Sequence, residues 1–203
     1  ISVSAFLLNR SSDLVVFTYR FVQPDYITLG ANGFNQNSRT FGGNVSSSLF
    51  SGKAFLSVNG YLQRDNLDKK QVYTNQVGSY AVNWSNYFGD NMTLSVRYNG
   101  VSQKQFDGTM IVPEDSRINR INHSIDVTPS YNLTLDNEHT FELNFNFLQN
   151  KNLNELMEST YFDASPLSFG LGYDLYLRGP RLAVSANYGY EISRFYGDTH
   201  HSH

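Results

Sequence analysis

The stretch Glu138-His139-Thr140-Phe141-Glu142-Leu143-Asn144-Phe145-Asn146-Phe147 alternates strictly between polar and apolar side chains from Thr140 onward. A period of two places alternate residues on opposite faces of a β-strand. One face then carries Phe141, Leu143, Phe145 and Phe147. A core strand of a soluble sandwich has the same pattern, so the number of such strands, their length and their connections decide the fold.

The alternation recurs along the whole chain, and no segment has helical periodicity. It predicts about ten strands. Their approximate ranges are 2–8, 15–21, 41–49, 54–63, 76–88, 92–99, 121–133, 138–147, 167–176 and 181–195.

The connections between these segments alternate between short turns and long polar loops. Short turns such as Gly89-Asp90-Asn91 alternate with long loops at 22–39, from 64, at about 104–119 and at about 150–165. Outer-membrane barrels have this asymmetry, and a tilted strand of about 10 residues crosses a bilayer. The pattern therefore predicts an all-β fold, an antiparallel up-and-down transmembrane β-barrel over residues 1–196, followed by a flexible His-rich tail at 197–203. The alternative is a soluble β-sandwich or lipocalin-like barrel with its apolar face inside.

Composition restricts the function classes. The net charge is −3 with 16% charged residues, so the chain lacks the basic surface of a nucleic-acid-binding protein. Cysteine is absent, which excludes disulfides and thiolate metal sites. No apolar run reaches the roughly 18 residues of a transmembrane helix. The polar mean hydropathy of −0.40 is compatible with a membrane barrel, because half of each strand faces a polar lumen.

The two faces predict two sets of residues. The apolar positions are expected to face lipid: Leu94, Val96, Phe141, Leu143, Phe145, Leu171 and Val184. The charged positions on the opposite face are expected to face the lumen: Arg20, Arg97, Asp126, Glu142, Asp174 and Glu191. Most other residues on that face are Ser, Thr, Asn or Gly, which are too small to fill a narrow barrel. The loop alternation also places both chain ends on the long-loop side. We therefore expect a segment of a larger barrel, which does not close by itself through pairing of residues 2–8 with residues 181–195.

Three stretches resemble large, poorly characterised outer-membrane β-barrel proteins of Bacteroidota. The first runs from Phe17 through Pro24-Asp25-Tyr26 to Leu29-Gly30-Ala31, where an aromatic strand enters a loop. The others are Asp65-Asn66-Leu67 and the stretch Arg117 to His123. The resemblance covers about residues 20–130. It implies a location in the bacterial outer membrane and supplies no catalytic residues.

Candidate reactive residues have simpler interpretations. His123 and His139 fall in register with apolar positions, and a loop-flanking or interfacial role is favoured over catalysis for both. His123 and Ser124 cannot act together as base and nucleophile, because adjacent strand residues point to opposite faces. The acidic loop residues fit solvated charge better than a Ca²⁺ site. They are Asp65, Asp68, Asp107, Glu114 and Asp115. We expect no metal and no cofactor.

The favoured function is a non-enzymatic outer-membrane barrel that acts as a channel, a transport component or a scaffold of a larger envelope complex. Its expected partners are outer-membrane lipid and further strands or other envelope proteins. The alternative is a soluble or periplasmic β-barrel that binds an apolar ligand. A membrane-embedded hydrolase is a third hypothesis, and no assembled triad supports it.

Overall fold

The computed structural model describes residues 2–7, 13–23, 37–156, 163–195 and 198–202. They form one antiparallel sheet of eleven strands. The strands are β1 (Ser2–Leu7), β2 (Asp13–Val22), β3 (Ser38–Leu49), β4 (Ala54–Arg64), β5 (Tyr73–Phe88), β6 (Met92–Asp107), β7 (Asn119–Thr134), β8 (Glu138–Asn152), β9 (Leu167–Leu177), β10 (Leu182–Phe195) and β11 (Asp198–Ser202). The predicted all-β, antiparallel, up-and-down architecture is confirmed.

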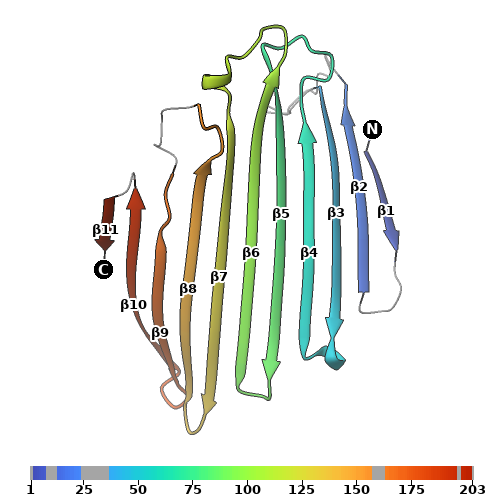
Figure 1. The fold of residues 1–203 in the computed structure, drawn as a ribbon. Coiled ribbons are helices and arrows are strands. Elements are labelled where there is room, and N and C mark those ends of the chain that lie inside the picture. Colours follow the sequence, from blue (N-terminus) through green and yellow to red (C-terminus); the bar gives the residue numbers. More distant parts are fainter. Residues whose placement is uncertain (1, 8–12, 24–36, 157–162, 196–197, 203) are drawn as a thin grey trace.

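The strands follow one another in chain order across a single curved layer, from β1 at one edge to β11 at the other (Figure 1). Within the described residues, the sheet is not closed into a barrel: β1 pairs with β2, β11 pairs with β10, and β1 pairs with neither β10 nor β11. This agrees with the expectation that the chain does not close a barrel by itself. Short turns lie at one end of the sheet and longer connections at the other (Figure 1). We call these the turn end and the loop end.

The strand boundaries differ from the predicted ones mainly at the loop end. β6 continues to Asp107 and β8 to Asn152, where loops were expected from about 104 and about 150. The last residues of β6 and β8 are mostly polar, so they lack the polar–apolar alternation that predicts a strand. They are nevertheless paired with β5 and β7, respectively. The tail, which had no predicted strand, contributes β11, paired with the last residues of β10.

The ladder separates the chain into an apolar and a polar face. Residues that pair directly across strands point to the same side, and the row Val58, Val82, Tyr98, Ile125 and Phe147 runs through five consecutive strands. The intervening residues form the polar face. Among the described elements, no second sheet or helix covers either face of this single layer (Figure 1).

This architecture buries very little. A folded monomer of 23.1 kDa exposes about 9,700 Å², whereas this chain exposes 13835 Å². Among the described residues, the buried hydrophobic ones are only Val22, Ala54 and Ala164. Large apolar side chains such as Phe17 and Leu171 are more than half exposed. The sheet therefore has no conventional core.

The helical elements described are two short 3₁₀ turns, Phe50–Gly52 and Glu114–Ser116. No described helix has the length and apolar character needed to cross a membrane.

Candidate functional site on the polar face

A continuous row of polar residues crosses the polar face. Each residue lies directly opposite the next on the neighbouring strand, so the row runs perpendicular to the strands from β3 to β10. It consists of Ser46, Ser57, Asn83, Arg97, Asp126, Asn146, Ser168 and Glu191. We call it the polar row. Three of the six charged residues predicted for the lumen, Arg97, Asp126 and Glu191, fall in it.

Arg97 and Asp126 occupy the middle of the polar row. They are direct cross-strand partners on β6 and β7. Each side chain, however, forms a hydrogen bond with an asparagine on the strand at its other side, β5 for Arg97 and β8 for Asp126. Arg97 Nε donates to Asn83 Oδ1 at 3.1 Å, and Asn146 Nδ2 donates to Asp126 Oδ1. No ion pair joins Arg97 to Asp126 in the described part of the chain. The row thus presents a cation and an anion side by side, each oriented by an amide.

A hollow of about 360 Å³ lies over this pair. Its lining includes Asn83, Arg97, Asp126 and Thr128 from the polar face, and also Phe55. Arg97 is exposed and Asp126 is half-buried, so water reaches both charges. Such a surface can solvate polar solutes or ions, because donors and acceptors alternate along it.

The other predicted lumen residues share this face but lie away from the central hollow. Glu142 accepts a hydrogen bond from Asn144 Nδ2 at 2.8 Å, and Asp174 lies opposite Thr140 and Ser185. Arg20 is exposed near the loop end of β2. The ladder therefore places all six charged residues on one face, distributed over the sheet.

The seven residues predicted to face lipid all lie on the opposite face. Leu143 pairs with Leu171, and Phe145 pairs with both Val127 and Phe169. The rings of Phe145 and Phe169 meet edge to face at 5.5 Å. A hollow of about 360 Å³ lined by Met92, Tyr131, Phe141, Leu143 and Leu171 is almost wholly apolar. No described element of the chain covers these side chains.

Histidine–tyrosine contacts on the apolar face were not predicted. His123 Nδ1 is 2.8 Å from the Tyr98 hydroxyl and 3.2 Å from the Tyr80 hydroxyl, and His139 Nδ1 is 2.8 Å from the Tyr173 hydroxyl. These contacts give polar atoms a partner on an apolar surface. The loop-flanking or interfacial role of the two histidines stays a prediction. Their tyrosine partners could not be predicted, because the sequence does not show the register between neighbouring strands.

Gly100 makes room for Tyr80 in this cluster. The two residues are direct cross-strand partners, and a Cβ at Gly100 would lie 2.2 Å from the Tyr80 ring. The tyrosine ring therefore lies over the glycine backbone, as aromatic side chains do where they cover a strand glycine.

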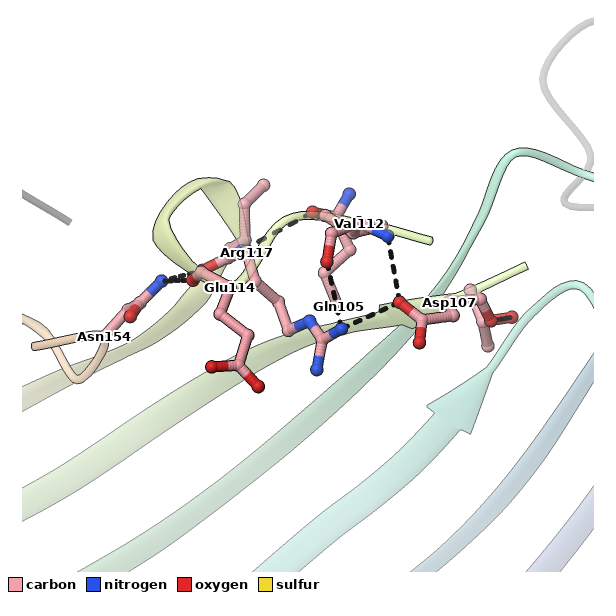
Figure 2. A network of polar contacts seen from close by, with 8 residues as sticks. Gln105, Asp107, Val112, Glu114, Arg117 and Asn154 are labelled. Atoms are coloured by element: carbon pink, nitrogen blue, oxygen red, sulfur yellow. Dashed lines mark hydrogen bonds and ion pairs between the residues drawn. The ribbon is translucent and has the colours of Figure 1, made fainter. Parts of the chain in front are cut away.

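A polar network holds the loop end of β6, β7 and β8 together (Figure 2). Arg117 Nη2 donates to Asp107 Oδ1 at 2.7 Å and to the Val112 carbonyl at 3.1 Å. Asn154 Nδ2 donates to the carbonyls of Glu114 and Arg117, both at 2.7 Å. Asp107, considered above as a cation ligand, is thus bound to a guanidinium.

A second loop-end turn, residues 65–72, is built around Asn66, which is only 1% exposed. Asn66 Nδ2 donates to the Tyr73 carbonyl at 3.1 Å and to Thr74 Oγ1 at 3.0 Å, and Asn66 Oδ1 accepts from the Gln71 N–H at 2.9 Å. The resemblance stretch Asp65-Asn66-Leu67 therefore forms an ordered turn. The other resembling loop, from Pro24 to Ala31, lies outside the described residues.

Asp68 lies in the same turn. Desolvation raises the pKa of its carboxyl, but hydrogen bonds from the Lys70 N–H and the Asn37 amide, together with the Lys70 charge, outweigh that effect and lower the pKa below its usual value. Asp65 bonds the backbone and side chain of Asn75. Across the described residues, no group of three or more His, Asp or Glu side chains is arranged to hold a metal ion.

Comparisons with models of protein families, with curated proteins and with solved structures found no match for this chain.

Proposed function

We propose that this chain contributes a membrane-spanning sheet to a non-enzymatic outer-membrane β-barrel, with its apolar face against lipid and its polar row facing an aqueous interior. In this role it acts as a channel, a transport component or a scaffold of a larger envelope complex. The observation that carries the proposal is the uncovered apolar face. Apolar area in water is unfavourable by about 25 cal/mol per Å², so a soluble single layer of this kind is not a stable end state.

The length of the apolar band along each strand matches the thickness of a bilayer and supports lipid as the environment of this face. On the apolar face, the band runs from Phe41 to Leu49 in β3, from Tyr80 to Phe88 in β5 and from His139 to Phe147 in β8. A membrane β-strand needs about 9–11 residues at a tilt of about 45°. β5, β6 and β7 have 16 residues each and would extend past the hydrocarbon at the loop end.

The unpaired edges of the sheet support the proposal that additional strands complete the barrel. On the side away from β9, β10 is paired only at residues 191–195, with β11. Residues 182–189 are all exposed. Unpaired backbone cannot remain in contact with lipid, because no water satisfies it there. We propose that other strands, within the same barrel, pair with β1–β2 and β10–β11.

Refolding the chain with and without a membrane mimetic tests the proposal. We expect stable β circular dichroism and protease protection of the strands in maltoside micelles or phosphatidylcholine vesicles, and aggregation in buffer alone. A monodisperse, protease-resistant β-protein in detergent-free buffer would contradict the proposal and favour the soluble barrel that binds an apolar ligand.

A further inference from the structure

On strands β3 to β9, the charged side chains of the apolar face lie at one end only. From β3 to β9, the Lys and Arg residues on this face are Arg39, Arg64, Lys104 and Lys151, and all four lie at the loop end. The same face of these strands has no Asp or Glu. The cations therefore border the apolar band on one side.

Two of these cations are direct cross-strand partners. Arg39 on β3 lies opposite Arg64 on β4, and like charges in this position repel each other. Both are exposed, and no ion pair is made by either within the described residues. Each guanidinium lies over an aromatic ring, Arg39 over Phe41 at 5.4 Å and Arg64 over Phe106 at 5.5 Å from the ring centroid.

A groove of about 410 Å³ lies between these arginines and the 65–72 turn. Among the described residues that line it, three are cations, Arg39, Arg64 and Lys69, and none carries a carboxylate. The other lining residues are Tyr19, Phe21, Asn66 and Leu67. The groove therefore combines concentrated positive charge with an apolar wall.

The nearest acidic residues in the sequence are engaged elsewhere. Asp65 bonds Asn75 N and Nδ2, and Asp68 bonds Asn37 and Lys70. The buried side chain of Asn66 holds the turn that carries Lys69, whose N–H donates to the Asn66 carbonyl at 3.1 Å. The cationic groove is thus formed by the hydrogen-bonded 65–72 turn together with β3 and β4.

We propose that this groove binds the phosphate group of a membrane lipid, with the acyl chains lying along the apolar band below it. Guanidinium groups match phosphate oxygens in a bidentate geometry, and a phosphate between Arg39 and Arg64 would relieve their repulsion. Basic pockets that border an apolar membrane surface are suited to anionic head groups. This inference rests on the proposed function, because it needs the apolar face to meet lipid.

Native mass spectrometry of the refolded chain in maltoside micelles tests the inference. The probes are short-chain phosphatidic acid, phosphatidylcholine of the same chain length and inorganic phosphate. We expect phosphatidic acid to bind at least about tenfold more tightly than either of the others. The double variant Arg39→Gln/Arg64→Gln should lose about tenfold in affinity for phosphatidic acid, since two charge-assisted contacts are removed.

Two further double variants serve as controls. Arg39→Lys/Arg64→Lys keeps the charge but loses the bidentate guanidinium geometry, so its affinity should fall between those of the unmodified chain and the glutamine variant. Lys53→Gln/Arg181→Gln removes two charges at the turn end and should bind like the unmodified chain. If Arg39→Gln/Arg64→Gln fails to fold, Lys69→Gln on the exposed turn replaces it, with an expected loss of about threefold.

Three outcomes would overturn the inference: unchanged binding by the folded glutamine variant, an equal loss in the turn-end control, or equally tight binding of inorganic phosphate. Each leaves the membrane proposal intact, provided the unmodified chain folds in micelles. Failure of that chain to form β-structure in micelles would instead contradict the proposed function itself.

Discussion

Arg97 and Asp126 lie directly opposite each other on β6 and β7, yet each bonds an asparagine rather than its charged partner. Asn83 orients the guanidinium and Asn146 orients the carboxylate. An internal ion pair would neutralise both groups, whereas this arrangement leaves two oriented charges over the central hollow. In the proposed barrel, this pair is therefore the best candidate on the polar face for contact with an ion or polar solute in the interior.

The first prediction concerns ion selectivity. In the assembled barrel in a planar bilayer, Arg97→Gln should shift the reversal potential in a salt gradient toward cation preference, because a positive charge is removed from the lumen wall. Asp126→Asn should shift it in the opposite direction. The control Asp115→Asn, in the exposed 3₁₀ turn at the loop end, should have a smaller effect. Shifts of the same sign for the two polar-row variants would contradict this assignment.

The second prediction compares the two faces at adjacent positions. Leu143→Arg should lower the free energy of unfolding in phosphatidylcholine vesicles by about 2–4 kcal/mol, the cost of a cation at the middle of a lipid-facing surface. Asn144→Arg on the same strand should cost less than about 1 kcal/mol, because Asn144 lies on the polar face beside Glu142. Guanidinium titration measures both values. The reverse ranking would mean that the faces are exchanged.

The third prediction tests the close approach between Gly100 and Tyr80. Gly100→Ala should reduce the free energy of unfolding by about 1–3 kcal/mol, because the new methyl group collides with the ring and displaces it. Gly179→Ala adds the same methyl group at a turn where no atom lies within 4 Å, and it should be nearly neutral. Equal unfolding midpoints for the two variants would show that the ring is not fixed there.

The fourth prediction concerns pH at the 65–72 turn. The folded pKa of Asp68 lies below its ordinary value of 3.8, so its contribution is present above that pH and is lost as the pH falls through the folded pKa. Pepsin cleavage within the turn should therefore increase between about pH 4 and about pH 2. Asp68→Asn should weaken this pH dependence. An unchanged cleavage profile in the variant would assign the effect to other groups.

The sequence predicted the strands and their faces because a period of two is a local property. The ten predicted strands correspond to β1 to β10, and residues such as Arg97 and Leu143 could be assigned to faces without knowing their neighbours. The tail strand β11 was missed, because His200-His201-Ser202 carries no alternation signal.

The features that required the structure depend on register between strands. The opposition of Arg39 and Arg64 joins residues 25 positions apart, and the contact of Tyr98 with His123 depends on the same kind of pairing. A shift of one residue would place every side chain of a strand on the other face. That the chain does not close on itself was inferred from the alternation of loop lengths and from the small polar residues of one face, and β1 and β11 are indeed the two unpaired edges of the sheet.

The most direct test of the account measures what each face contacts. The chain contains no cysteine, so single spin labels can be introduced at Phe145→Cys and Asn144→Cys without background. In phosphatidylcholine vesicles, the label at 145 should be accessible to oxygen and protected from a water-soluble nickel reagent, whereas the label at 144 should show the opposite accessibility. A label at 145 that is accessible to the nickel reagent, with a label at 144 in lipid, would contradict the proposed orientation of the sheet.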